Sequence, residues 1–448
     1  MRRPLPFLAA LAVLILAGAS APRAPRPRVI LVSVDGLWAR DLQRAESAGV
    51  RLPVLDSLRR AGALAAGVIG SVPSVTFPSH TTMMTGVPPA RHGVYSNQRP
   101  WFPTDTGPDA RAWYWDAEQV RVPGLFEAAR AAGMTTAAVY WPVTAHHRSI
   151  DYNIPDAWDP RMPDSVLVSL RRLGTGWLLD SLGAARAGGT SDSLRAHWTG
   201  AIIRRWDPDF VLLHLLDVDH WKHEQGPAGD SLWAAVRGAD RYIGWVLDAA
   251  RARPRATTVI VTSDHGFLAY RQSLRPGVLL ARAGLVTLDS SGRVSDWTAG
   301  VVVNGGSAMF LPRDPHDTGD AGVAARIRAA IPDSLVGPGR PIRAIWSRDS
   351  LAALGGDPRA LWAIDMNEGY YTASGYRGEL LVARTRLGVG GGHGHDPRRP
   401  ELHAFFLASG TGIRPGTRLG MIRQTDIGPT VAKLLGLELR GAEGRPLF

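Results

Sequence analysis

Residues able to bind a metal ion lie where apolar segments of this sequence end. Asp35 closes the apolar run 28–35, Asp264 closes the run 257–264, and His265 follows it directly. Because open α/β sheets place their ligand sites at the carboxyl ends of strands, these side chains are expected to share one edge of a sheet. Carboxylate oxygens and imidazole nitrogens are common zinc ligands. The pattern indicates a metal site.

Two further segments supply the same ligand types. Asp219 and His223 are four residues apart just beyond another apolar run, close enough for one metal if the segment is helical or turn-like. His393 lies in GGGHGHD, where glycines let the backbone approach an ion closely. Each signal alone is also typical of caps and loops, but their joint occurrence favours a metal site. On residue type, four neighbours remain alternative ligands: His214, Asp217, His220 and His395.

The nucleophile of such a site has to be an oxygen. The chain contains no cysteine, which excludes disulfides, thiolate ligands and a cysteine nucleophile. A threonine or serine hydroxyl is a poor nucleophile at neutral pH, and coordination to a dication lowers its pKa enough to generate an alkoxide. The segment SVPSVTFPSHTTM offers several hydroxyls that chemistry alone does not separate: Thr76, Ser79, Thr81 and Thr82.

The segments that must position these residues alternate between strand and helix patterns. Apolar runs typical of buried strands occur at 28–35, 135–142, 210–217, 257–264 and 402–409. Helical spacing occurs at 53–63, 122–133, 192–206, 230–252 and 425–436. This order predicts an α/β fold with a doubly wound, mostly parallel sheet, because each continuous apolar strand needs cover on both faces.

The remaining segments suggest how the chain is divided. Residues 1–21 combine two arginines, a short apolar stretch and small residues, as in a signal peptide, so export to the periplasm or medium is expected, with a retained N-terminal anchor as the alternative. A proline-rich spacer is expected at 22–27 and a catalytic domain at 28–448. Within that domain the alternation is lost over 267–392, which predicts an insertion or subdomain.

Composition narrows the possible partners. The formal charge of +11 comes from 51 lysines and arginines against 40 acidic residues, and no basic run dominates. Nucleic-acid binding is therefore not expected, since a binding groove needs clustered cations with aromatic residues between them. Scattered arginines can still raise the local concentration of an anionic small molecule. The hydrophobic fraction of 45% is ordinary for a globular protein.

Six motifs occur in a familiar order: VSVDG (32–36), SVTFPSHTTMMTG (74–86), HGVYSN (92–97), D-x-x-x-H-x-x-G-P (219–227), TSDHG (262–266) and GHGHD (392–396). Through them the chain, over roughly residues 28–448, resembles the nucleotide pyrophosphatase/phosphodiesterase family of the alkaline phosphatase superfamily. The resemblance implies an alkaline phosphatase-like sheet. It also implies hydrolysis of a small-molecule phosphodiester or nucleotide.

The resemblance also assigns roles by position. It implies two Zn²⁺ ions, one bound by Asp35, Asp264, His265 and Thr76, the other by Asp219, His223 and His393. Thr76 would attack phosphorus to give a covalent phospho-threonine, and Asn97 would hydrogen-bond a non-bridging oxygen. Phe77, beside the nucleophile, would line the leaving-group pocket.

The chain departs from the family near the fourth motif, D-x-x-x-H-x-x-G-P (219–227). The family usually has tyrosine where this chain has His214, and glycine where it has Lys222. His214 is therefore the candidate for the second wall of the substrate pocket, and nucleotide preference stays open. The alternatives are a metal-dependent phosphomonoesterase or phosphonate hydrolase, or a catalytically silent binding protein. The intact ligand set disfavours the silent protein, and TFPSH lacks the C/S-x-P-x-R motif of classical sulfatases.

Overall fold

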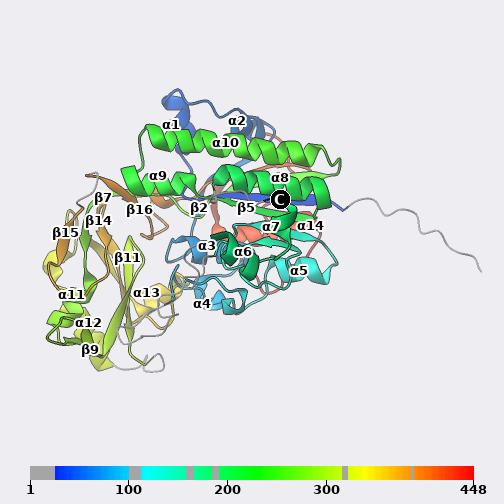
Figure 1. Ribbon diagram of the computed structural model, residues 1–448. Coiled ribbons are helices and arrows are strands. Elements are labelled where there is room, and N and C mark those ends of the chain that lie inside the picture. Colours follow the sequence, from blue (N-terminus) through cyan, green and yellow to red (C-terminus); the bar gives the residue numbers. More distant parts are fainter. Residues whose placement is uncertain (1–25, 100–112, 158–165, 184–190, 315–320, 385–387) are drawn as a thin grey trace, which may run out of the picture.

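The structure is a computed structural model that describes residues 26–99, 113–157, 166–183, 191–314, 321–384 and 388–448 (Figure 1). The expected leader at 1–21 and most of the spacer at 22–27 lie outside the described residues. Among the described residues, no helix combines the length and apolar character needed to cross a bilayer.

An eight-stranded sheet forms the centre of the molecule, in the order β18-β2-β17-β6-β1-β5-β3-β4. Its strands are β1 (Arg28–Val34), β2 (Gly62–Ile69), β3 (Thr136–Val139), β4 (Tyr152–Ile154), β5 (Phe210–Leu215), β6 (Thr257–Thr262), β17 (Phe406–Gly410) and β18 (Thr417–Arg423). β17 is antiparallel to both of its neighbours, and the other pairs are parallel. The predicted fold class, an α/β protein with a mostly parallel sheet, is confirmed.

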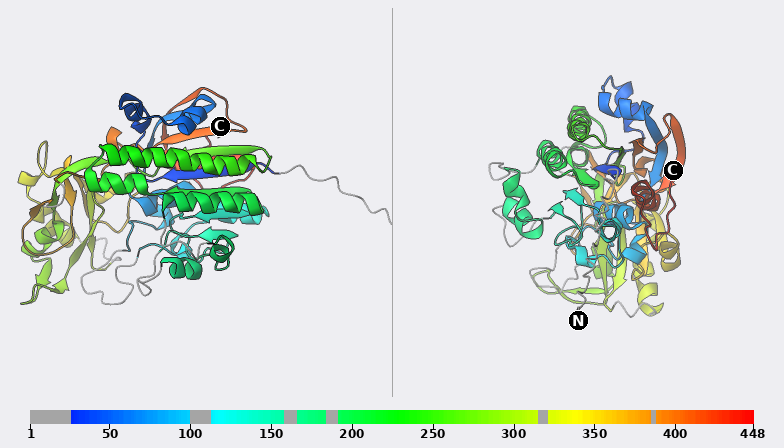
Figure 2. Two further views of the ribbon diagram at one scale, coloured as in Figure 1. Left: turned by 45° about the horizontal axis from the view of Figure 1, so that its top comes forward. Right: turned by 90° about the vertical axis from the view of Figure 1, so that its right-hand side faces the viewer.

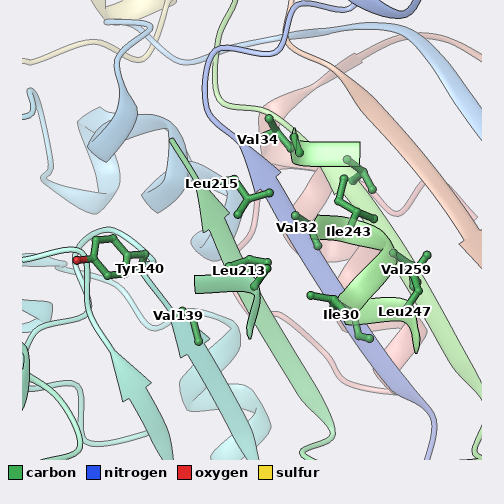
Figure 3. Close-up of a cluster of buried hydrophobic side chains, with 14 of the residues drawn as sticks. Ile30, Val32, Val34, Val139, Tyr140, Leu213, Leu215, Ile243, Leu247 and Val259 are labelled. Carbon is green, nitrogen blue, oxygen red and sulfur yellow. The ribbon is translucent and has the colours of Figure 1, made fainter. Parts of the chain in front are cut away.

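The central strand β1 shows why the apolar runs become strands. Every residue of β1 is buried, and successive side chains point to opposite faces of a sheet. Ile30 and Val32 pack into one hydrophobic cluster, shown in Figure 3, while Val29 and Leu31 pack into the cluster on the other face. An uninterrupted apolar sequence is what a strand covered on both faces requires.

Helices cover both faces of this sheet (Figures 1 and 2). The face shown in Figure 3 is covered by α1 (Asp41–Ser47), α2 (Pro53–Arg60), α6 (Val166–Leu173), α7 (Leu178–Ser181), α8 (Asp192–Trp206) and α10 (Asp230–Arg251). The opposite face packs against α3 (Thr76–Thr85), α5 (Leu125–Ala131) and α14 (Ile427–Leu435). Two further helices are α4 (Pro89–His92) and α9 (Asp217–Gln225).

Residues 268–392, here called the small lobe, contribute no strand to the eight-stranded sheet. One sheet contains β7 (Leu268–Leu274), β14 (Gly369–Thr372), β15 (Leu381–Ala383) and β16 (Gly390–Gly392). A second contains β10 (Ala299–Val303), β11 (Ser307–Pro312), β12 (Ile342–Ser347) and β13 (Trp362–Met366), and β8 (Val286–Leu288) pairs with β9 (Val294–Trp297). Its helices are α11 (Pro276–Arg282), α12 (Ala321–Ala330) and α13 (Arg348–Ala353). The small lobe has a hydrophobic cluster of its own.

Candidate metal centre

The carboxyl ends of three neighbouring strands bring most of the predicted ligands together. β1 lies between β5 and β6 and is parallel to both, so their carboxyl ends meet at the same edge of the sheet. Asp35 follows β1, Asp264 and His265 follow β6, and α9, which follows β5, carries Asp219 and His223. The predicted sixth ligand, His393, follows β16 of the small lobe.

One group of donor atoms comes from Asp219, His223 and His393, within 4.8 Å of one another. The two imidazole Nε2 atoms are 3.1 Å apart, and Nε2 of His223 is 3.4 Å from Oδ1 of Asp219. Nδ1 of His223 faces the Gly391 carbonyl at 3.0 Å, and Nδ1 of His393 faces the Ser74 carbonyl at 3.1 Å. A carbonyl only accepts, so each Nδ1 carries the proton and donates. This leaves both Nε2 lone pairs available to a metal.

A second donor group comprises Asp35, Asp219 and His265. Nε2 of His265 lies 3.4 Å from Oδ1 of Asp35 and 3.1 Å from Oδ2 of Asp264, so the predicted ligand Asp264 is also at this position. The imidazoles of His265 and His393 stack at 3.6 Å, which places the two groups side by side. The prediction assigned Asp219 to one metal alone, whereas its carboxylate is within reach of both groups.

The buried polar atoms of this region fit a bound cation. Among the described residues no hydrogen-bond partner is present for Oδ1 of Asp35, Oδ1 of Asp219, Oδ2 of Asp264 or either ring nitrogen of His265. A buried polar atom without a partner costs about 1–3 kcal/mol, more when charged. Coordination would satisfy these atoms together, and a mixture of carboxylates and imidazoles is a donor set that suits zinc.

The pKa shifts reflect how deeply these titratable groups are buried and how closely they are crowded together. Burial, followed by the carboxylates of Asp219 and Asp264, raises the pKa of Asp35 well above its ordinary value. Burial alone would lower the pKa of His265, but the adjacent Asp264 carboxylate outweighs it and raises that pKa to about 9. For His393, burial and then the neighbouring imidazoles hold the pKa well below the ordinary value. A neutral imidazole is the form that binds a metal.

Thr76 is the first residue of α3 and keeps 8% of its surface exposed. The three other hydroxyls in the segment have partners: Ser79 pairs with Ser71, Thr81 donates to the Phe77 carbonyl, and Thr82 pairs with His92. Nδ1 of His80 also faces the Thr76 carbonyl at 2.8 Å, which fixes the first turn of the helix.

The predicted residue Asn97 lies at the same helix start. Its Oδ1 accepts a hydrogen bond of 2.9 Å from the Phe77 backbone N–H. The amide Nδ2 therefore keeps its donors for another acceptor. Because the N-terminus of a helix carries a partial positive charge, this location suits an anionic group.

A pocket of about 320 Å³ opens beside the donor groups and is shared by both parts of the molecule. Asn97, Trp113, His223 and His393 line it from one side, and Val301–Gly305 and Tyr371 of the small lobe line it from the other. Sequence reasoning missed the small-lobe residues because only the folded chain brings them to the site. The described lining residues include one arginine, Arg99.

The two predicted substrate-binding residues occupy other positions. His214 is fully buried, with Nε2 3.2 Å from Oδ2 of Asp35 and Nδ1 3.1 Å from the Tyr140 carbonyl, so it contacts Asp35 and does not line the pocket. Phe77 is 2% exposed within a hydrophobic cluster, and its ring lies 5.2 Å from that of Trp113. Trp113 lines the pocket, as does Tyr371 of the small lobe.

Of the alternative ligands left open by the sequence, His214 contacts Asp35, and His220 is exposed. His395 is buried, with its backbone carbonyl accepting from the Ser74 hydroxyl. Asp217 is partly buried, and its backbone N–H donates to Asp192. Neither donor group includes any of the four.

Comparisons with known proteins agree with this geometry. A family model described as type I phosphodiesterase / nucleotide pyrophosphatase matches residues 29–396. Ectonucleotide pyrophosphatase/phosphodiesterase family member 3 of Mus musculus is 23% identical over 54% of this chain and 25% of its own length, so the chain spans about a quarter of that relative. Bis(5'-adenosyl)-triphosphatase enpp4 of Mus musculus is 24% identical over 92% of this chain and 78% of its own length.

The fold also matches solved structures. The structure of murine ectonucleotide pyrophosphatase / phosphodiesterase 5 superposes with a TM-score of 0.66 at 19% identity, covering 93% of this chain and 97% of that one. A second structure of that murine protein, described as inactive and in complex with AMP, gives the same TM-score of 0.66 at 18% identity. The expected alkaline phosphatase-like arrangement of the sheet is thereby confirmed.

Proposed function

The chain belongs to the type I phosphodiesterase / nucleotide pyrophosphatase family, and from this premise we propose that it is a two-zinc enzyme that hydrolyses phosphodiester or phosphoanhydride bonds. The observation that carries the proposal is the location of the two donor groups. They lie beside a pocket whose wall includes Asn97, and Asn97 is bonded to the first turn of α3, where Thr76 stands.

We assign the residues as follows. Asp35, Asp264 and His265, with the Thr76 hydroxyl, would hold one Zn²⁺, and Asp219, His223 and His393 would hold the other. Bound zinc would supply Lewis acidity, which lowers the pKa of a coordinated hydroxyl and neutralises charge on the phosphoryl group. The unpartnered carboxylate oxygens and the free Nε2 atoms support this assignment.

The reaction uses Thr76 as the nucleophile. Its Oγ1 forms a bond to phosphorus while the bond to the leaving oxygen breaks, and that oxygen departs as an alcohol or a phosphate. Water then cleaves the phospho-threonine, which restores the hydroxyl and releases the second product. Asn97, whose Oδ1 is occupied by the Phe77 N–H, presents Nδ2 to a non-bridging oxygen.

A nucleotide-like diester is the proposed substrate class. The pocket walls combine Trp113 and Tyr371 with apolar residues of β10, which suits an aromatic or other apolar substituent on the phosphate. Arg99 is the one arginine among the described lining residues, whereas a doubly charged monoester usually requires more cations. The AMP bound to the related murine protein supports a nucleotide ligand. Export remains proposed from the leader pattern in the sequence.

The test compares two substrates with one leaving group. We expect the purified chain to hydrolyse the p-nitrophenyl ester of thymidine 5′-monophosphate faster than p-nitrophenyl phosphate, and only when zinc is present. A chelator should remove both activities and zinc should restore them. Preference for the monoester would place the chain with the phosphatases, and chelator-resistant hydrolysis would contradict the metal assignment.

A further inference from the structure

Lys222 is a fully buried cation in the middle of α9, at a position where the family pattern has glycine. Its Nζ donates to the Gly36 carbonyl at 2.7 Å and to Oδ2 of Asp41 at 2.5 Å. Burying an ammonium group is expensive unless it is paired and hydrogen-bonded. The two acceptors offset this cost, and one of them is the carbonyl of the residue directly after the proposed ligand Asp35.

Gly36 lies in a closely packed turn between the two donor groups. Its N–H donates to Oδ1 of Asp264 at 3.0 Å, while its carbonyl accepts from Lys222. Its φ of +67° favours glycine, and a Cβ here would lie 2.5 Å from the Phe267 ring. One residue therefore links Asp264, a proposed ligand of the first group, to the helix that carries Asp219 and His223 of the second.

The backbone of Lys222 is packed closely against the small lobe. A Cβ on Gly391 would lie 2.3 Å from the Lys222 carbonyl oxygen, so β16 packs directly on this turn of α9. The Gly391 carbonyl in turn accepts from Nδ1 of His223. Lys222 thus connects the turn after β1 with the segment that holds His223 and leads to His393.

Ion pairing with Asp41 does not by itself account for Lys222. The Asp41 carboxylate also accepts from the Trp38 backbone N–H at 2.9 Å and from Arg44 at 2.6 Å. It thus has partners that do not depend on Lys222. The contact specific to the lysine is the one with Gly36.

We propose that Lys222 is a positioning residue that sets the distance between the two metal-ligand groups by holding the Gly36 carbonyl against α9. This inference rests on the proposed two-zinc site. Because the geometry of first ligands is fixed by the groups behind them, loss of such a partner typically costs about 10–100-fold in metal affinity.

The experiment measures zinc per chain and zinc dissociation constants by competition with a chromophoric chelator, together with Tm. In Lys222→Met we expect the dissociation constant of at least one zinc to rise by about 10-fold or more. Arg28→Met is the matched control, since Arg28 is a buried cation paired with Asp207 at the opposite end of β1. It should lower Tm and leave both zinc constants unchanged.

Asp41→Asn separates the two contacts of the lysine. It removes the ion pair but leaves the Gly36 carbonyl available to Lys222, so Tm should fall while zinc affinity stays near that of the wild type. If Lys222→Met does not fold, Lys222→Gln replaces it: its polar amide is one bond shorter than the lysine ammonium and should not reach the Gly36 carbonyl, so the same weakening is expected.

The outcomes are distinguishable from failure of the proposed function. Equal zinc affinity in the wild type and in the folded Lys222 variant would overturn the positioning role alone. A wild-type chain that binds no zinc would overturn the metal site and this inference together. Weakened zinc in Arg28→Met as well would show a general effect of destabilisation and also contradict the inference.

Discussion

The two ends of β1 are both buried and both charged, yet they are built differently. At the amino end, the terminal nitrogens of Arg28 donate to Asp207 at 2.6 Å, to the Ala250 carbonyl at 2.8 Å and to Thr257 at 3.0 Å. At the carboxyl end, Asp35 lies near two other carboxylates, and its Oδ1 has no partner among the described residues.

This difference separates charge that stabilises the fold from charge that serves a ligand. A paired buried ion contributes to the folded state, whereas several carboxylates crowded together, each with one oxygen lacking a hydrogen-bond partner among the described residues, raise its free energy. Repulsion of this kind between buried carboxylates is typical of functional sites, where a bound ligand relieves it. The carboxyl end of β1 is therefore where binding should be measured, and the amino end is where stability should be measured.

The largest effect should follow from Thr76→Ala. Removing the nucleophile should lower kcat by about 10³-fold or more, because the remaining groups still bind the substrate but no covalent step is available. Zinc content should stay close to that of the wild type, as the protein's charged ligands remain. Steady-state kinetics and metal analysis check both points. Thr81→Ala is the matched control. Unchanged turnover in Thr76→Ala would contradict the assignment of Thr76 as the nucleophile.

The next largest effect is expected for Asp264→Asn. This change neutralises one proposed ligand while the amide oxygen can still accept from the Gly36 N–H, so the weakening of one zinc should reach about 100-fold. Asp207→Asn makes the same chemical change at the other end of β1 and should leave zinc binding intact. Full zinc occupancy in Asp264→Asn at low free zinc would contradict the view that the carboxyl end of β1 serves to bind metal.

A smaller effect, on stability alone, is expected for Arg28→Met. It removes one partner of a pair whose aspartate is 22% exposed, so the free energy of unfolding should fall by about 2 kcal/mol, less than for a fully buried pair. Denaturant unfolding of the zinc-loaded chain measures this. Added zinc should raise the Tm of this variant as it does that of the wild type. A variant that no longer responds to zinc would show that the two ends are coupled.

The smallest effect is expected for Asn304→Ala in the small lobe. Oδ1 of Asn304 accepts from the Ser96 hydroxyl at 2.7 Å, and Nδ2 has no partner among the described residues although the residue lines the pocket. If a substrate oxygen accepts from Nδ2, the substitution should lower kcat/KM about 10-fold. Ser307→Ala, in the strand that follows, is the control, and equal values for the two variants would leave Asn304 without a role in binding.

The core of the fold was predictable because its strands are long and apolar. β2 and β18 were not predicted. The sequence GALAAGVI of β2 is rich in alanine and glycine, and its extended form depends on pairing with β17 and β18. The short strands of the small lobe are likewise defined by their partners, since many of their residues are partly exposed and show no clear period.

The positions of the proposed ligands along the strands were predictable for a related reason, since the end of an apolar run marks the edge of the sheet. The direction of a single side chain was not. His214 lies in β5 between Leu213 and Leu215, so it points to the face that α3 covers, where its ring lies 4.3 Å from that of His80. Sequence could place His214 near the site, but only the three-dimensional structure shows that it supports Asp35 and does not face the pocket.

The order in which the proposed ligands occur along the chain has a consequence for biosynthesis. Asp35 directly follows the first strand of the fold, and His393 directly follows the small lobe. Contacts between such distant segments form late in folding. A growing chain therefore cannot assemble the proposed site before His393 has been synthesised, so the proposed zinc ions would bind only after that point. The supply of zinc in the compartment where folding ends would then limit the yield of active protein.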